Sequence, residues 1–196
     1  MKELKVRITF IEEVLGTANS DKDIHEEFIA SKAPDAPSRE EEVAALGVEE
    51  VVLKGKTVFP RNNAGEPILW NYQVKGFFKS AAKVGSYMGG DYKLSAYKQK
   101  IDLLVFINER QIPLILPNGK EMRSCQRPLR AQTMQGERVA LANSETCPAG
   151  TTATFTVRVL DDNLMPFVKQ WLDYGIYNGF GAWRNSSKGS FTWEEI

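Results

Sequence analysis

The apolar residues of this chain repeat with two different periods, and the order of those periods limits the folds that the chain can adopt. Residues 4–12 alternate apolar and polar side chains, which is typical of a β-strand with one buried face. Residues 71–84 instead place apolar side chains three and four positions apart, as an amphipathic helix does. A strand rich in β-branched residues follows at 151–160, and a last helix ends at Gly175. Strands and helices therefore alternate along one sequence.

Shorter elements complete this order. Further strands are predicted at 57–59, 103–107 and 190–194, and further helices at 20–29, 38–47 and 94–104. A turn at 117–120 joins an apolar run at 112–116 to a strand that starts near Met122, which predicts a hairpin. The order is compatible with an α+β fold of modified ferredoxin-like plan, a β-α-β-β-α-β sheet with helices on one face. We expect a single domain over residues 1–196, with a basic β-hairpin or finger inserted at about 108–150.

The composition points away from membranes and metals. No apolar run approaches the roughly 20 residues that span a bilayer, and the charged start lacks the apolar core of a signal peptide, so we expect a cytoplasmic protein. The two cysteines, Cys125 and Cys147, and the single histidine, His25, do not form a zinc-binding set. We therefore expect no metal, no cofactor and free thiols.

Charge is balanced overall but segregated along the sequence. Residues 1–50 contain 6 Lys and Arg against 13 Asp and Glu, whereas residues 51–138 contain 15 against 6. An anionic partner would bind the middle of the chain. The same segregation permits self-association, in which the acidic part of one copy meets the basic part of the next.

A glycine-rich segment near the C-terminus, residues 175–191, combines backbone freedom with stacking surface and positive charge. Its glycines would let a loop pass close to a bulky partner. Trp183 offers a platform for a base, and Arg184 and Lys188 offer phosphate contacts. The alternative is an ordinary turn between a helix and a closing strand, with aromatic residues that belong to the core.

Two further basic groups are candidates for phosphate contacts. Residues 123–138 carry four arginines and few apolar side chains, which indicates an exposed finger, and the planar guanidinium group can bond two phosphate oxygens at once. Lys75, Lys79 and Lys83 lie four apart on one side of the helix predicted at 71–84, where a solvated surface is the alternative explanation. The candidate nucleic-acid-binding residues are therefore Lys75, Lys79, Arg123, Arg127, Arg130, Arg138, Gly179, Gly181, Trp183, Arg184, Lys188 and Gly189.

Three segments make the chain resemble the repeat-associated mysterious protein (RAMP) superfamily of CRISPR systems, and its backbone subunits in particular. The first strand ends in Leu15-Gly16-Thr17, and the helix entered through residues 72–79 is similar to the Ser-Leu-Lys-Gly pattern of those subunits. The third segment, Gly179-Phe-Gly181 to Lys188-Gly189, lies between the last helix and the last strand. The whole sequence also resembles uncharacterised prophage proteins of Gram-positive bacteria.

The superfamily resemblance implies binding of single-stranded RNA, or of single-stranded DNA, by a protein that oligomerises along the strand. We expect no enzymatic activity, because His25 lies among acidic residues that would repel a phosphate backbone. Two alternatives stay open. One is a phage decoy of the anti-CRISPR type, which binds or joins a host effector complex, and the other is an RNA endonuclease of the same superfamily.

Overall fold

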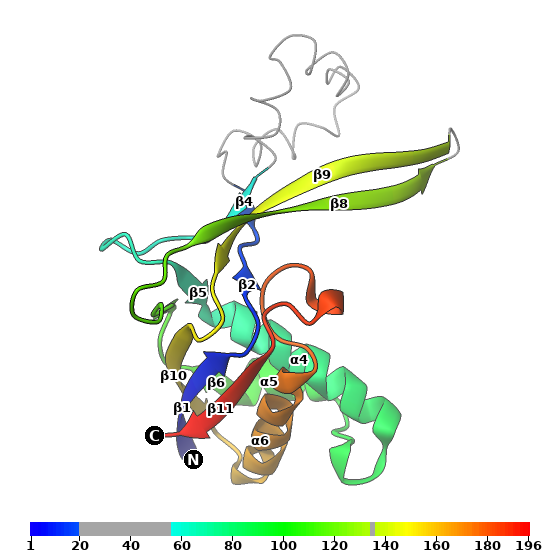
Figure 1. Cartoon of the computed structure of the whole chain (residues 1–196). Coiled ribbons are helices and arrows are strands. Elements are labelled where there is room, and N and C mark those ends of the chain that lie inside the picture. The colour runs from blue at the N-terminus through cyan, green and yellow to red at the C-terminus, as the bar shows by residue number, and fades with distance from the viewer. Residues whose placement is uncertain (20–55, 134–135) are drawn as a thin grey trace, which may run out of the picture. The chain divides into compact units, whose positions relative to one another are not determined.

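The chain consists of two compact units, each formed by segments from separate parts of the sequence. A computed structural model describes residues 1–19, 56–133 and 136–196 (Figure 1). The first unit comprises Met1–Val14, Pro60–Glu121 and Cys147–Ile196, and the second comprises Leu15–Phe59 and Met122–Thr146. The helices predicted at 20–29 and 38–47 lie outside the described residues.

A four-stranded antiparallel sheet in the order β11-β1-β10-β6 is the centre of the first unit. Its strands are β1 (Lys2–Phe10), β6 (Val105–Ile107), β10 (Thr152–Val159) and β11 (Phe191–Glu195). Val6 pairs with Phe155 of β10, and Ile8 pairs with Trp193 of β11. The first strand of the chain is therefore enclosed by two strands from its C-terminal part.

The alternation predicted for β1 is confirmed by the burial of its side chains, and β10, predicted from its β-branched residues, has the same pattern. Every second residue of β1 is buried, namely Leu4, Val6, Ile8 and Phe10. In β10 the buried residues are Ala153, Phe155, Val157 and Val159, and the residues between them are half-buried. One face of the sheet is thus apolar and covered, because the side chains of a strand point alternately to its two faces.

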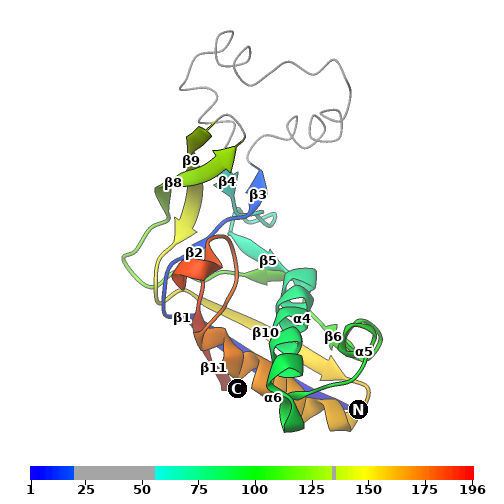
Figure 2. The ribbon, with the colours of Figure 1, turned by 90° about the vertical axis from the view of Figure 1, so that its right-hand side faces the viewer.

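Helices of the first unit supply the cover. Figure 2 shows α4 (Asn71–Met88) and α6 (Met165–Asp173) side by side over one face of the sheet, while α5 (Tyr97–Leu104) lies near β6. The buried stripe of α4 includes Val74, Phe77, Phe78 and Ala81, as the helical spacing predicts. Before α6, the Asp161 carboxylate accepts a hydrogen bond from the Asn163 N–H and caps a short 3₁₀ turn, Asp162–Leu164.

The hairpin predicted around residues 117–120 is wrong. The turn itself exists, since the Lys120 N–H donates to the Pro117 carbonyl oxygen at 3.1 Å. However, β7 (Gln111–Pro113) pairs with β5 (Ile68–Trp70) instead of with the strand that follows the turn. Ile112 pairs there with Leu69, and both side chains are buried. The pairing of β7 is decided by burial against a segment that is distant in the sequence. A turn pattern describes only neighbouring residues and therefore could not predict this partner.

The second unit is built on a long antiparallel hairpin formed by β8 (Arg123–Thr133) and β9 (Gly136–Cys147). The short strands β2 (Val14–Leu15), β3 (Ala18–Asn19) and β4 (Thr57–Val58) join the same sheet. Thr57 pairs with Ser144 in parallel, and the Thr57 hydroxyl donates to the Ser144 hydroxyl oxygen at 2.8 Å. The finger predicted at about 108–150 contains this hairpin, whereas residues 108–121 belong to the first unit.

Gly16 of the Leu15-Gly16-Thr17 segment has a structural reason to be glycine. Its N–H donates to the Glu145 carbonyl oxygen at 2.9 Å, and a Cβ atom at this position would lie 2.4 Å from the Val58 carbonyl carbon. The backbone of β4 therefore occupies the space that a side chain would need.

The α+β class predicted from the sequence is confirmed, with mixed sheets and three α-helices among the described residues. Within that part of the chain, none of the helices is both long enough and apolar enough to cross a membrane.

Candidate nucleic-acid interface

The glycine-rich loop between α6 and β11 is anchored in the core by one aromatic side chain. Phe180 is buried, and its ring lies 5.1 Å from the ring of Phe77 and 5.3 Å from the ring of Phe191. Phe10 of β1 completes the cluster, with its ring 6.3 Å from that of Phe180. The loop therefore has a fixed base, from which the residues between 181 and 188 extend.

Gly179 and Gly189 are close to each other across this base. The Phe180 N–H donates to the Gly189 carbonyl oxygen at 3.0 Å. A Cβ atom on Gly179 would lie 1.6 Å from that same oxygen, and one on Gly189 would lie 1.8 Å from the Phe180 carbonyl oxygen. Two stretches of backbone thus meet here, so these two glycines have an explanation within the fold of the loop. Gly181 and Gly189 also have φ values of 83° and 74°, in the left-handed region that favours glycine.

Lys188 fastens the loop to the residues that follow β1. Its ammonium group lies 2.8 Å from a Glu13 carboxylate oxygen and 3.3 Å from a Glu12 carboxylate oxygen, and its side chain is only 18% exposed. The hydrogen bond to Glu13, assisted by Glu12, raises the pKa of Lys188 above its ordinary value. Two of the three N–H donors of Lys188 are therefore directed at carboxylates.

Trp183 and Arg184 are the residues that the loop presents outward. Trp183 is 40% exposed and has a φ of 60°, which is rare for a bulky side chain and costs about 1–3 kcal/mol. Arg184 begins the short 3₁₀ turn Arg184–Ser186, and its side chain is exposed. Within the described residues, Arg184 has no ion-pair partner. The turn therefore holds an indole and an unpaired guanidinium group next to each other in the sequence.

The arginines of the second unit are distributed along the β8–β9 hairpin. Arg123 pairs with Thr146 and Arg127 with Ala142, and because they are four residues apart on one strand they share a face. Arg123 is exposed, and within the described part of the chain it has no ion-pair partner; Arg127 is half-buried. Arg130 and Arg138 lie nearer the hairpin turn, at the positions opposite Val139 and Ala131.

Lys75 and Lys79 face α5 and are engaged there. Lys79 forms an ion pair with Asp102 at 2.6 Å, and the Lys75 ammonium group lies 3.3 Å from the Asp102 carbonyl oxygen and 4.7 Å from the centre of the Phe106 ring. Burial lowers the pKa of Lys75, and the positive charge of Lys79 lowers it further, whereas Asp102 raises it. These two lysines help to attach α5 to α4.

The candidate residues therefore fall into separate groups. Within the first unit, Lys75 and Lys79 lie two residues to either side of Phe77, and two residues correspond to about 200° around a helix. They consequently project away from the side of α4 that contacts the glycine-rich loop through Phe77. The loop and the hairpin belong to different units and form two independent candidate surfaces.

Several residues that shape the loop were missed in the sequence. Phe180 was given no role of its own within the Gly179-Phe-Gly181 segment, although an aromatic residue between two glycines can indicate an anchor in the core. The sequence around Glu12 and Glu13 did not indicate that they form ion pairs, because their partner Lys188 is about 175 residues away.

Cys125 and Cys147 are free thiols, as expected, and among the residues described no group of three or more His, Cys, Asp or Glu side chains could hold a metal ion. His25 lies outside the described residues.

Comparison with known proteins gives a result at the level of structure alone. No protein-family model matches the sequence, and no curated protein matches it. Two solved structures are similar over the whole chain. One is a chain of the Type III-B Cmr-beta complex bound to cognate target RNA, with a TM-score of 0.58 and 11% identity. The other is a chain of a Type IV-B CRISPR complex, with a TM-score of 0.50 and 11% identity.

The chain covers 61% of the Cmr-beta chain and 90% of the Type IV-B chain, so it spans less than two thirds of the length of the first of these relatives. The resemblance to RAMP proteins that the sequence predicted is confirmed for the fold. The chain shares its fold with subunits of two CRISPR complexes.

Proposed function

We propose that this protein binds single-stranded nucleic acid without cleaving it, RNA in preference to DNA, in the manner of a CRISPR backbone subunit. It is encoded by a phage, acts in the cytoplasm of the bacterial host and oligomerises along the bound strand. Host CRISPR effector subunits are further candidate partners. In this proposal the sheet β11-β1-β10-β6, with α4 and α5 as one crossover and α6 as the other, is a modified ferredoxin-like plan.

The observation that carries the proposal is the turn at Trp183 and Arg184. An exposed indole can stack on a base of any sequence, and an unpaired guanidinium group can bond a phosphate. The left-handed backbone of Trp183 is an unfavourable conformation that the buried Phe180 and the surrounding hydrogen bonds maintain. Such local strain is often found where a side chain must be held ready for a ligand.

The hairpin arginines and the structural relatives support the same function. Arg123 and Arg127 lie on one face of a long hairpin, which suits contacts to successive phosphates of an extended strand. One of the two similar structures is a complex bound to target RNA. We assign no catalytic step, because the one histidine, His25, has acidic neighbours in the sequence that would repel the scissile phosphate.

Fluorescence anisotropy with a labelled single-stranded RNA, the matching DNA and the duplex tests the proposal. We expect salt-sensitive binding to both single strands, tighter for RNA, and weaker binding to the duplex. Trp183→Ala should weaken single-strand binding by about tenfold, because stacking on an aromatic ring is worth about 1–3 kcal/mol per base. Arg184→Ala should weaken binding and reduce its salt dependence.

Arg110→Ala is the matched control. Arg110 is also exposed in the first unit, and among the described residues it has no ion-pair partner, so this variant loses the same charge away from the loop. Equal affinity of the wild type, Trp183→Ala and Arg184→Ala would reject the loop as the interface. Absence of binding to any strand would favour the decoy alternative, and RNA cleavage that is lost in His25→Ala would favour the endonuclease.

A further inference from the structure

A cavity of about 280 Å³ lies between α4 and α6 in the first unit, outside the residues considered so far. Four of the residues that line it are aromatic, namely Tyr92, Trp171, Tyr174 and Tyr177. Met88 and Gln170 are also part of the lining. The cavity is therefore a concave aromatic site, at the small end of the range in which ligand pockets occur.

One wall of the cavity depends on glycines. Gly89 and Gly90 have φ values of 77° and 55°, and they turn the chain after α4 into the 3₁₀ helix Gly90–Tyr92. This turn returns across α4 at Gly85, where a Cβ atom would lie 2.5 Å from the Tyr92 carbonyl oxygen. These three glycines thus let the chain at Tyr92 approach α4 closely, and this approach places Tyr92 at the cavity.

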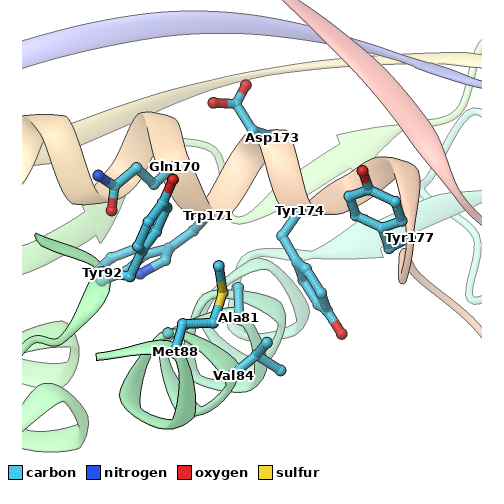
Figure 3. A pocket seen from close by; sticks show the side chains of 10 residues that line it. Ala81, Val84, Met88, Tyr92, Gln170, Trp171, Asp173, Tyr174 and Tyr177 are labelled. Atoms are coloured by element: carbon cyan, nitrogen blue, oxygen red, sulfur yellow. The ribbon is translucent and has the colours of Figure 1, made fainter. Parts of the chain in front are cut away.

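The other walls are arranged as a slot. Figure 3 shows the Tyr92 and Tyr174 rings on two sides of the cavity, with Met88 between them and Trp171 behind Tyr92. Gln170 and Trp171 are consecutive residues of α6, and both line the cavity. Tyr92 is 48% exposed, whereas Trp171 is only 3% exposed. The open side of the slot is therefore bordered by rings, and its floor is apolar.

The polar groups at the slot are neutral and available. Within the described part of the chain, neither the Gln170 side-chain amide nor the hydroxyl groups of Tyr92, Tyr174 and Tyr177 have a hydrogen-bond partner. Among the lining residues there is no Lys or Arg, and the one charged residue, Asp173, accepts a hydrogen bond from the Trp193 indole N–H at 2.9 Å. Figure 3 shows the Asp173 carboxylate pointing away from Met88. The site thus offers stacking surface and neutral hydrogen-bonding groups but nothing that attracts a phosphate.

We propose that this cavity binds a nucleobase, inserted between Tyr92 and Tyr174 and bonded at its edge by the Gln170 amide. The flat faces of the rings match a planar heterocycle. A side-chain amide both donates and accepts hydrogen bonds, as the edge of a base does. The volume admits one base or nucleoside, and any phosphate stays outside. This site is separate from the strand interface proposed above, and its base belongs either to a free nucleoside or to a bound strand.

Nuclear magnetic resonance of the full chain with ¹³C-labelled methionine methyl groups tests the proposal. The Met88 methyl signal, identified by its loss in Met88→Leu, reports on the cavity directly. Titration with adenosine, guanosine, cytidine and uridine should give a saturable shift of this signal for at least one nucleoside, because a stacked base carries a ring current. The corresponding 5′-monophosphate should bind no more tightly than the nucleoside.

Two variants should weaken the binding without unfolding the protein. Tyr92→Ala should raise the dissociation constant at least about tenfold, in line with the loss of one stacking ring. Gln170→Leu removes the amide but keeps a side chain of similar size, and it should reduce the difference in affinity between the four nucleosides. Tyr87→Ala is the matched control, because Tyr87 is 78% exposed on α4 and does not line the cavity.

A single-stranded oligonucleotide distinguishes the two sources of the base. A Met88 shift with nucleosides alone supports a free nucleoside as ligand, and a shift with the oligonucleotide that abasic replacement abolishes supports a base of a bound strand. Absence of a saturable shift with either ligand would overturn the proposal. Undiminished binding in Tyr92→Ala, or tighter binding of N-acetyltryptophanamide than of any nucleoside, would overturn it as well, and the latter would indicate a protein partner.

Discussion

Gly179 and Gly189 are small for a reason that the fold itself supplies. At each position an added Cβ would overlap with backbone from the other side of the loop, because the carbonyl oxygens of Gly189 and Phe180 occupy the space that a methyl group would need. Backbone cannot rotate away as a flexible side chain can, and the buried Phe180 ring prevents the loop from lifting. The stability of the loop and the shape of its outer turn therefore depend on the same two positions.

The variant Gly179→Ala should lower the free energy of unfolding by about 3 kcal/mol or more, because a fixed stretch of backbone must move. Gly65→Ala is the comparison, since Gly65 has a φ of 81° but no atom within 4 Å of its added Cβ, and it should lose only about 1 kcal/mol. Urea unfolding followed by circular dichroism measures both. Equal losses would mean that the close contact at Gly179 is relieved without cost.

At the scale of elements, the parts with a strong period were predictable from the sequence. Each of four elements buries one face, and the spacing of its apolar residues indicates which face that is. These elements are β1, β10, α4 and α6. The partner of β7 was not predictable, because pairing with β5 depends on burial against a segment about 40 residues away. The same limit applies to Lys75 and Lys79, whose shared side of α4 turned out to face α5.

The candidate site was predictable in residue type and only partly in geometry. The sequence indicated that Trp183 can stack on a base and that Arg184 can bond a phosphate, but no local pattern indicated the left-handed backbone of Trp183. Nothing local indicated that Lys188 meets Glu12 and Glu13. The cavity beside α4 was missed because it is created by the return of the chain over Gly85.

The β8–β9 hairpin permits a prediction about phosphate contacts. Replacing Arg127 and Arg130 by Ala together should weaken single-strand binding for all sequences alike. The slope of log affinity against log salt concentration should fall by roughly 0.7 for each lost contact. Anisotropy titrations at several salt concentrations measure this slope.

The single variant Arg110→Ala again serves as the control for loss of charge outside the hairpin. If the double variant is folded by circular dichroism and keeps the slope of the wild type, the hairpin does not contact phosphates.

Pro128 lies between the two arginines in β8. Proline has no N–H to donate to a further strand, which suits the position of β8 at the edge of its sheet.

At the scale of the whole molecule, the charge segregation predicts association between copies. Residues 1–50 carry an excess of acidic side chains and residues 51–138 an excess of basic ones, so a head-to-tail contact between copies is attractive. Such a contact is heterologous and generates rings or open filaments. Multi-angle light scattering should show oligomers at low salt that dissociate as salt is added, because mobile ions screen the attraction.

A long oligonucleotide should increase the size of these oligomers if copies assemble along a strand. Only monomers at low salt, both with and without the oligonucleotide, would contradict the prediction.

The position of β1 between β10 and β11 has a consequence for how the protein is made. β1 must wait for both of its hydrogen-bonded neighbours, β10 and β11, because they are synthesised much later than β1. Until then the apolar side chains of Leu4, Val6, Ile8 and Phe10 have no sheet to join. Closure of long loops makes such non-local pairing slow. We therefore expect the first unit to fold only after β11 has been synthesised, and we expect β1 to be exposed to aggregation until then.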